Sequence, residues 1–520
     1  MDQTLQSAGS PTGSARVLLI ITVILCTLIE LIDATIINVA IPEISGSIGA
    51  TATEIAWVVT IYAIANAIVL PLSGMLSDLF GRRNYFTGSV VIFTIGSLMC
   101  GLSTSLWELI LWRFIQGVAG GGLAAIAGSI VIGAFPPEKI NTANAIFGSG
   151  LIIGPIIGPL FGGLIVQHLS WHWIFFVNVP LGIIGCFMSW LFVTNLAHSK
   201  RPEKIDWWGI LFLSIGIGSL LYFFEEGGRD DWFNSTTITL VFITTILGLT
   251  AFIWRELSTA HPAVNIRILR HYNLLMGCIF TVLMGCIMMA GMFIFPLFVR
   301  SAYGWTPIKT GVFLMCMGIA LILGMAPARK LIENGLKPKY SMVIGAGVVV
   351  FSMIMMSFSG PDSHESNFLL PLMIQGLGMP FLLLPILQLS FRGYQGSELQ
   401  QAAGLRNMFK KIGGAIGLPI VTTYLNHQNA NAAVALGQYS DFSDPQVIQR
   451  VEGLKQLFIS AGYATDDALN AAYQMLGNLF LKQQILISYT HTYLMMGILV
   501  IVFCLPVILL LKNKKPTALK

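Results

Sequence analysis

The sequence predicts an all-α integral membrane protein that crosses a lipid bilayer many times. Apolar residues make up 55% of the 520 residues, charged residues only 10%, and the mean hydropathy is +0.77. These values lie far from those of soluble proteins. Apolar stretches of span length recur along the chain, and Lys and Arg collect in alternate connecting segments. Together, the three observations indicate a chain whose solvent is mostly lipid.

About fourteen spans are predicted with a window of about 19 residues. They lie near 17–41, 54–76, 85–105, 107–133, 141–166, 171–196, 206–225, 236–256, 272–299, 307–328, 340–359, 367–391, 401–425 and 486–511. One alternating set of connecting segments holds roughly 22 of the 29 Lys and Arg residues, which predicts that both termini are cytoplasmic. Residues 1–15 are polar and weakly basic, so we expect the first span to stay in the membrane rather than to be cleaved as a signal peptide.

Two segments interrupt the regular spacing of the spans. Residues 201–260 hold a pair of spans that divides the others into six and six, a 6+2+6 layout, and residues 426–485 form a long polar loop on the outer side with two stretches of helical periodicity. The expected units are a cytoplasmic tail over 1–15, a six-helix bundle over 16–200, two inserted helices over 201–260, a second six-helix bundle over 261–511 that includes the loop, and a tail over 512–520.

Two acids lie inside the first span, in LIELIDATIINVAIP over 28–42. Each carboxylate costs roughly 2.5 to 3.5 kcal/mol to insert, so Glu30 and Asp33 are predicted to be functional. Arg113 lies in the RFIQG motif of the fourth span. At 1.5 Å per residue, Asp33 and Arg113 lie about 12 Å and about 9 Å inside the outer ends of their spans. The matched depths favour pairing of Arg113 with Asp33 or with a substrate, and the alternative is that Arg113 reaches outward to the membrane surface.

The segment after the second span, GMLSDLFGRR, is typical of a tight cytoplasmic turn. The glycines permit close helix approach, and the charged residues can cap, or pair with, nearby groups. Its candidate gating residues are Gly74, Asp78, Gly81, Arg82 and Arg83. In the second half, PARKLIENGLKPK partly repeats this pattern through Gly335 and Lys337, which indicates two related halves of a rocking transporter.

The fifth predicted span, GSGLIIGPIIGPLFGG over 148–163, places glycine at every fourth position and adds two prolines. Glycines on one face let another helix approach closely, and prolines allow bending. The residues concerned are Gly150, Gly154, Pro155, Gly158, Pro159 and Gly162. The pattern predicts a hinge or a sealed interface between the halves.

Predicted cavity walls are apolar, rich in methionine and low in fixed charge, as in MGCIMMAGMFIF over 284–295. Such walls can repack around varied lipophilic ligands, although ordinary helix packing explains them equally well. The candidate cavity residues are Asn38, Gln116, Gln375, Met288 and Met292.

Motifs for other chemistry are missing from the sequence. There is no phosphate-binding GxxxxGK[ST], no HExxH, and no Cys/His pair at metal spacing. We therefore expect no cofactor, no metal, no nucleic-acid partner and no enzymatic activity. A membrane enzyme or a receptor is the remote alternative.

The motifs together resemble the major facilitator superfamily. The resemblance rests on five motifs: LIDATIINVAIP, GMLSDLFGRR, RFIQG, GLIIGPIIGPLFGG and WHWIFFVNVPLG. Within the superfamily, the sequence is most similar to the fourteen-span drug:proton antiporters of the EmrB/QacA type, and among these it resembles EmrB-type exporters most. It implies the major facilitator fold, with proton coupling at Asp33 and Arg113, antiport at the fifth-span glycines and prolines, and gating at the turn after the second span. Glu30 departs from the family pattern, in which a neutral residue is more usual. It is a further candidate for proton coupling as the holder of a second proton, and the alternatives are that it attracts a cationic substrate or is a protonated, hydrogen-bonded acid.

The resemblance implies a proton-driven multidrug efflux antiporter in a bacterial inner membrane. Protons, small lipophilic or amphipathic compounds and membrane lipid would be its partners. Residues 426–485 would dock a periplasmic membrane-fusion adaptor and, through it, an outer-membrane channel. The alternative is a proton-coupled exporter of one defined solute, such as a fatty acid, a siderophore or another metabolite.

Overall fold

The computed structural model is helical throughout the part of the chain that it describes, with no strand among those residues. The described residues are 13–135, 147, 154, 157–158, 160–194, 205–228, 230–259, 261–391, 394, 396–437 and 445–511. The predicted tails over 1–15 and 512–520 lie almost entirely outside them.

The first half contains α1 to α7 and the inserted pair follows it. The helices are α1 (Ser14–Ile48), α2 (Ala52–Phe80), α3 (Arg82–Leu102), α4 (Leu106–Gly133), a helical stretch over 160–168, α6 (Trp173–Phe176), α7 (Asn178–Phe192), α8 (Trp207–Gly227) and α9 (Thr236–Ser258). Short 3-10 turns, η2 (Trp232–Asn234) and η3 (Ile266–Arg270), precede and follow α9.

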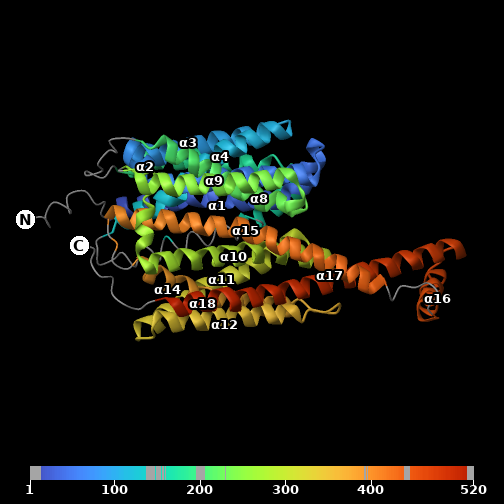
Figure 1. Cartoon of the computed structure of the whole chain (residues 1–520). Helices are drawn as coiled ribbons and strands as arrows, with labels where there is room; N and C mark the ends of the chain where they lie inside the picture. The colour runs from blue at the N-terminus through green and yellow to red at the C-terminus, as the bar shows by residue number, and fades with distance from the viewer. Residues whose placement is uncertain are drawn as a thin grey trace, which may run out of the picture.

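The second half contains α10 to α18. These are α10 (Tyr272–Tyr303), α11 (Pro307–Glu333), α12 (Pro338–Ser357), α13 (Ser366–Gly378), α14 (Pro380–Phe391), α15 (Gly396–Gly437), α16 (Pro445–Ser460), α17 (Thr465–Leu499), a π-helical turn η4 (Val500–Cys504) and α18 (Leu505–Leu510). Figure 1 shows α1 to α9 on one side of the bundle, α10 to α14 with α17 and α18 on the other, and α15 between them.

Local sequence explains where several helices begin and end. α1 ends at Gly49, whose φ of 73° is a left-handed conformation that glycine adopts readily. α2 begins with a capping box, in which the Glu54 backbone N–H donates to the Thr51 hydroxyl and the Thr51 N–H donates to the Glu54 carboxylate at 2.8 Å. The capped start fixes the position at which α2 enters the bundle.

Twelve helices in the described part of the chain are long and apolar enough to cross a membrane. Two predicted spans are not among them. The span over 141–166 lies largely outside the described residues, and the span over 401–425 lies within α15, which carries three basic residues and many polar ones. The chain is therefore an all-helical, multi-span protein, and the count of fourteen, the 6+2+6 layout and the cytoplasmic placement of both termini stay predictions.

Glycines allow the closest helix contacts in both halves. In the second half, a Cβ atom added at Gly413 or Gly417 of α15 would overlap Val282 or Cys286 of α10. In the first half, a Cβ at Gly117 of α4 would lie 2.6 Å from the Tyr62 carbonyl oxygen of α2. The same device, a backbone-to-backbone approach at small residues, thus forms the central helix pair of each half.

The inserted pair α8 and α9 lies against both halves. α8 contacts α2 through Trp57 and Tyr222, whose ring centroids are 5.2 Å apart. A Cβ at Gly228, at the end of α8, would lie 2.6 Å from the Thr423 hydroxyl of α15. A buried apolar cluster that includes Leu70, Leu213 and Leu405 joins α2, α8 and α15. Both α8 and α9 fall within the predicted insertion over 201–260.

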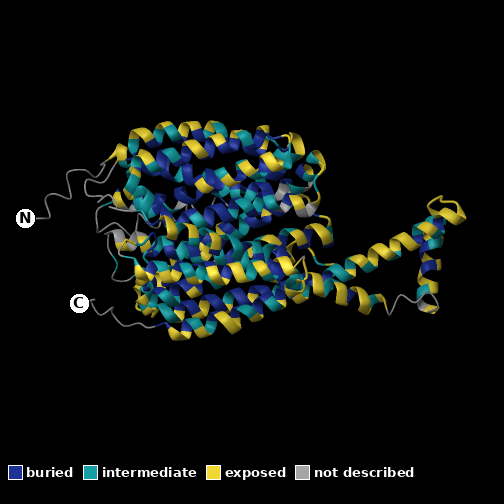
Figure 2. Cartoon of the chain, turned by 45° about the horizontal axis from the view of Figure 1, so that its top comes forward, coloured by how far each residue is buried: buried dark blue, intermediate teal, exposed yellow. Residues whose placement is uncertain are grey.

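The described residues of the segment over 426–485, 426–437 and 445–485, form an arm of helices rather than a loop. α15 runs on to Gly437, and α17 begins at Thr465 and continues through its span, so both span helices extend beyond the bundle (Figure 1). α16 packs on the far part of α17 through Val451, Leu454 and Ala472. Much of the arm is exposed (Figure 2). The two predicted helical stretches correspond to α16 and the start of α17. The predicted loop boundaries at 426 and 485 differ from the helix ends, because α15 runs on to Gly437 and α17 already begins at Thr465.

We predict that Gly413→Leu destabilises the protein by about 3 kcal/mol, because the side chain cannot fit against the Val282 backbone. Gly347→Leu on α12 is the matched control, since nothing lies within 4 Å of a Cβ there and the change should be within about 0.5 kcal/mol. Thermal unfolding of the purified variants in detergent measures both. Equal midpoints for the two variants would contradict the glycine contact.

Candidate functional site

A fully buried ion pair joins α1 and α4. Arg113 Nη1 donates to Asp33 Oδ2 at 2.6 Å, and both side chains are 0% exposed. The two residues that the sequence places at matched depths are thus in direct contact. The alternative for Arg113, in which its side chain reaches out to the membrane surface, does not apply to this structure.

Polar groups from two further helices complete the environment of the pair. Asp33 Oδ1 accepts hydrogen bonds from Gln116 Nε2 at 3.0 Å and from Asn178 Nδ2 at 2.8 Å. Arg113 Nε donates to the Val58 carbonyl of α2 at 3.2 Å, and Nη1 also donates to Gln116 Oε1 at 2.8 Å. Four helices, α1, α2, α4 and α7, therefore meet at one carboxylate and one guanidinium.

The helical geometry explains how these groups converge. Arg113 and Gln116 are three residues apart and lie on one face of α4. Asn178 is the first residue of α7, and its amide also donates to the Ser97 hydroxyl of α3 at 3.1 Å. Ser97 in turn donates to the Phe175 carbonyl at 3.0 Å. Asn178 was not among the predicted site residues, although a lone polar side chain in WHWIFFVNVPLG could have indicated it.

Glu30 has a separate set of partners one turn away. Its Oε1 accepts hydrogen bonds from Tyr62 Oη at 3.3 Å and Asn66 Nδ2 at 3.1 Å, both from α2. Its Oε2 is buried without a hydrogen-bond partner. The Tyr62 ring also lies 4.1 Å from Arg113 Cζ, within cation–π range. Tyr62 therefore links the two acidic sites, and no sequence motif marks it as a site residue.

The arrangement is suited to holding or releasing a proton at a buried carboxyl group. In a site of low dielectric, burial favours the neutral acid, while the guanidinium and the amide donors around Asp33 favour the carboxylate. Small changes in these opposing influences can then change the proton occupancy. Within the described residues, no group of three or more His, Cys, Asp or Glu side chains could hold a metal ion.

The predicted gating turn connects α2 and α3. Gly81 has a φ of 80°, which glycine tolerates without strain. Arg82 is buried, and its Nη2 lies 3.4 Å from the Ser129 hydroxyl of α4. Arg83 Cζ lies 4.0 Å from the centre of the Trp190 ring of α7. Both arginines thus anchor the turn to other helices of the first half.

The remaining gating residues lie along α2, where Gly74 is half-buried and Asp78 is exposed. The corresponding turn of the second half, between α11 and α12, contains Gly335 with a φ of 96°. Positive φ angles at both Gly81 and Gly335 support the internal repeat that the sequence indicates.

The glycines of the fifth predicted span pack against α1. A Cβ atom at Gly154, Gly158 or Gly162 would meet Leu31, Thr35 or Ile36 respectively. On another side of this segment, a Cβ at Gly311 of α11 would lie 3.2 Å from Leu160. The segment therefore lies between the helix that carries Asp33 and a helix of the other half. Gly150, Pro155 and Pro159 lie outside the described residues.

The predicted cavity residues whose side chains are described lie in both halves of the chain. Gln116 is fully buried in the Asp33 network. Met288 and Met292 lie half-buried on α10, and Gln375 lies half-buried on α13, with its Nε2 3.6 Å from a Cβ placed at Gly291. The side chain of Asn38 lies outside the described part of the chain.

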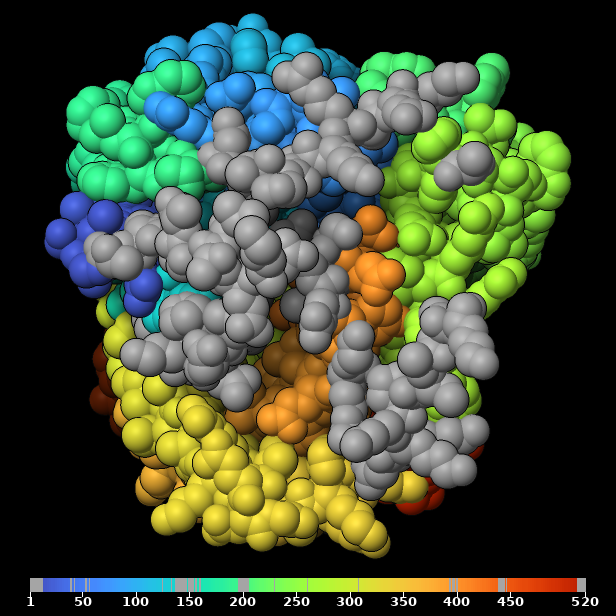
Figure 3. Space-filling model, turned by 90° about the vertical axis from the view of Figure 1, so that its left-hand side faces the viewer, coloured from blue at the N-terminus to red at the C-terminus, as the bar shows by residue number. Residues whose placement is uncertain are grey.

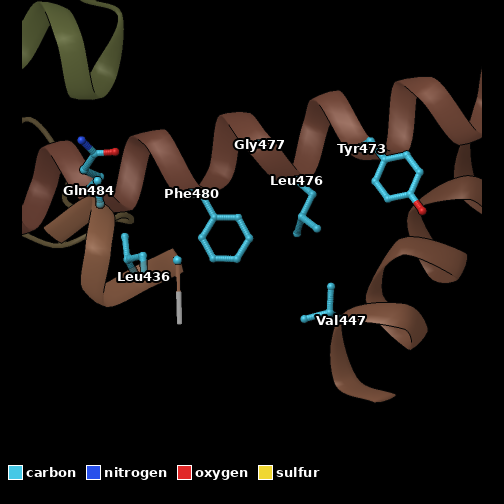
Figure 4. Close-up of a pocket in the computed structure, with 9 residues that line it drawn as sticks. Leu436, Val447, Tyr473, Leu476, Gly477, Phe480 and Gln484 are labelled. Carbon is cyan, nitrogen blue, oxygen red and sulfur yellow. The ribbon is translucent and has the colours of Figure 1, made fainter. Parts of the chain in front are cut away.

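An apolar pocket of about 570 Å³ lies on the arm, far from the buried ion pair. Figure 4 shows Leu476 and Phe480 of α17 and Leu436 of α15 around it, with Val447 of α16 across from them. Side chains of three helices thus form an apolar surface outside the bundle.

Comparisons with known proteins agree with this architecture. The model of the Major Facilitator Superfamily matches residues 23–418. The chain is 30% identical over 414 residues to the Multidrug export protein EmrB of Haemophilus influenzae, covering 79% of this chain and 80% of the relative. It is 28% identical over 418 residues to the Fatty acid resistance protein FarB of Neisseria gonorrhoeae, covering 80% of this chain and 82% of that relative.

A solved structure has a similar fold. It is a bacterial homolog of the human lysosomal transporter Spinster in an inward-facing, unoccupied conformation, with a TM-score of 0.58 and 14% identity. The match covers 98% of this chain and 100% of the other. At this identity the likeness shows the fold alone.

We predict that Arg113→Met destabilises the protein by about 3 to 5 kcal/mol, because it leaves the Asp33 carboxylate buried and unpaired. Adding Asp33→Asn should recover part of the loss, since the uncompensated charge is then removed. Arg300→Met, at an exposed position on α10, is the control. Unfolding in mixed detergent micelles measures all variants, and strictly additive effects of the two substitutions would contradict direct coupling.

Proposed function

Because the chain belongs to the Major Facilitator Superfamily, and is therefore a transporter and not an enzyme, we propose that it is a proton-driven antiporter that exports lipophilic or amphipathic compounds. The similarity to the multidrug export protein of Haemophilus influenzae over most of both chains supports export of several compounds. A bacterial inner membrane is the location that fits such an exporter.

The observation that carries proton coupling is the buried Asp33–Arg113 pair. Placing an ionisable pair deep in a membrane domain costs free energy, and such residues are usually functional. In the proposed cycle, a proton from the outside binds Asp33 and weakens its attraction to Arg113. The network that joins α1, α2, α4 and α7 then relaxes, and the halves rock about the central cavity. Release of the proton to the cytoplasm restores the pair.

Substrate enters from the cytoplasm or the inner leaflet. Its binding and the binding of the proton drive the same rocking motion of the halves in opposite directions. The ligand and the proton need not touch, because each can favour a different orientation of the halves. The glycine contacts of the fifth predicted span with α1 and α11 supply a place where the halves can seal or bend.

Export of one defined solute is the second candidate function. The similarity to the fatty acid resistance protein of Neisseria gonorrhoeae supports it, because that relative is named for one class of compound. A resistance screen with a deletion strain and its complemented parent would separate the two functions. Protection against cationic dyes, uncouplers and fatty acids together supports multidrug export, and protection against one class alone supports a dedicated exporter.

We further propose that the arm over 426–485 docks a periplasmic adaptor and that the protein is the inner-membrane part of a tripartite efflux system. Large apolar side chains are exposed on this polar arm, among them Val434, Ile448 and Leu457. Exposed apolar groups outside the bilayer are typical of protein contact surfaces. The apolar pocket between α15, α16 and α17 lies on the same arm.

We predict that Asp33→Asn abolishes uphill movement of substrate driven by a pH gradient, because the amide cannot bind and release the proton. Proteoliposomes loaded with the best compound from the resistance screen provide the measurement. Asp467→Asn, on the exposed start of α17, should behave as wild type. If the Asp33→Asn protein still accumulates substrate against its gradient, Asp33 does not couple transport to protons.

We predict that replacing residues 430–480 with a short Gly/Ser linker leaves transport in proteoliposomes intact but removes resistance in cells. The cut spares the stem, where Gln484 Nε2 donates to the Asn429 carbonyl at 3.1 Å. Monodisperse purified protein shows that the variant folds. Full resistance in cells, or loss of transport in proteoliposomes by a well-folded variant, would contradict an exclusive docking role.

A further inference from the structure

Three basic side chains lie deep within the second half. Arg406, Lys410 and Lys411 are on α15, and Lys410 is about 21 Å along the helix from its start at Gly396. The Lys410 carbonyl is in contact with Gly285, near the middle of α10. These cations therefore lie far from either end of the spans, where charged side chains are rare and usually functional.

Within the described part of the chain, the three cations lack carboxylate partners. Among the ion pairs of the described residues, none involves Arg406, Lys410 or Lys411. Arg406 Nη2 donates to Asn407 Oδ1 at 3.2 Å, and Cζ lies 5.1 Å from the centre of the Phe391 ring, but Nε is buried without a partner. The contrast with Arg113, whose charge is neutralised directly by Asp33, is clear.

This basic cluster lies beside an open space between the halves. Lys410 is exposed, and Arg406 and Lys411 are half-exposed, although α15 is a central helix of the bundle (Figure 1). Figure 3 shows α15, in orange, receding into a hollow between the first-half helices in blue and cyan and the second-half helices in yellow. An exposed lysine at this depth requires access to water or to a ligand.

Glu30 of α1 is an acidic residue of the opposite half. It lies close enough for the charge of Lys411 to act on it, yet the two form no ion pair. Glu30 is 1% exposed and accepts hydrogen bonds from Tyr62 and Asn66 of its own half. Glu30 therefore leaves most of the positive charge on α15 uncompensated, and such a field attracts an anion.

Apolar side chains border the basic cluster. Met289 of α10 is 49% exposed and contacts α15 at Gly414, one turn beyond Lys410. Met288, next to it, is half-buried. Flexible thioether side chains beside fixed cations suit a ligand with an acid group and an apolar body. Lipid headgroups stay at the membrane surface, so the depth of the cluster favours a free amphipathic acid.

We propose that Arg406, Lys410 and Lys411 form an anion-binding subsite that holds the acid group of a lipophilic weak acid, with Met289 against its apolar part. This assignment rests on the proposed export function and narrows its substrate class. The anion is held on the second half, while the proton is held on the first.

The test is binding of decanoate and decanol, which share a chain and differ in charge, to the full-length protein in nanodiscs of zwitterionic lipid. Equilibrium dialysis at pH 7.5, with empty nanodiscs as the blank, measures both. We expect wild type to bind decanoate about tenfold more tightly than decanol, the size of a charge-assisted contact. In Lys410→Gln/Lys411→Gln, decanoate should bind about tenfold more weakly, and decanol should be unaffected.

Lys330→Gln/Lys337→Gln, at exposed positions near the turn between α11 and α12, is the matched control and should behave as wild type. Lys410→Arg/Lys411→Arg keeps both charges and should keep the preference for decanoate. Should the double Gln variant fold poorly, Lys410→Gln alone changes only an exposed side chain and should lose part of that preference. An unchanged ratio of decanoate to decanol in the Gln variants, or a wild type without preference for decanoate, overturns the subsite.

No pH gradient is present in this binding test, so its result is independent of Asp33. A failure of proton-driven transport with retained decanoate preference would refute the proposed coupling and leave the subsite standing. The reverse result would refute the subsite alone.

Discussion

The structure of the first half depends on one buried ion pair. Removing a carboxylate and a guanidinium from water costs several kcal/mol for each group, and their attraction offsets that cost only with good geometry and further hydrogen bonds. The Asp33–Arg113 pair has a short contact and further hydrogen bonds, whose donors and acceptors are supplied by Val58, Gln116 and Asn178. Since these groups come from four helices, a shift of any one helix leaves a buried charge less well compensated.

Small residues make this polar network geometrically feasible. Gly120 and Gly121, which follow RFIQG, lie where α4 meets α1 and α2. A Cβ atom at Gly120 would lie 2.9 Å from the Tyr62 hydroxyl and 3.2 Å from Glu30 Cγ, so any other residue would displace the partners of Glu30. Gly121 approaches the Asn66 backbone in the same way. The glycines therefore leave room for the hydrogen-bond partners of Glu30 and also allow close helix packing.

Helical periodicity and the cost of burying charge are enough to predict the Asp33–Arg113 site and the close contact of the fifth span. Asp33 and Arg113 were placed at one depth by counting residues, and the glycine spacing of the fifth span indicated a close helix contact. Asn178 was missed because it reaches Asp33 across 145 residues of sequence, a contact that requires the tertiary arrangement. The polar composition of residues 426–485 predicts a loop, whereas α15 and α17 continue as helices beyond the bundle.

The two halves carry their charges in opposite ways. In the first half, the acids are buried and hydrogen-bonded to neighbouring helices, so a change in their protonation alters the contacts among those helices. In the second half, Lys410 is exposed and no cation of the basic cluster has a carboxylate partner in the described chain, so an anion can bind without prior rearrangement. The charge of Lys411 acts on Glu30, which adds a direct electrostatic route between the basic cluster and the acids to the coupling through rocking of the halves. This position also gives a physical reason for an acidic side chain at residue 30.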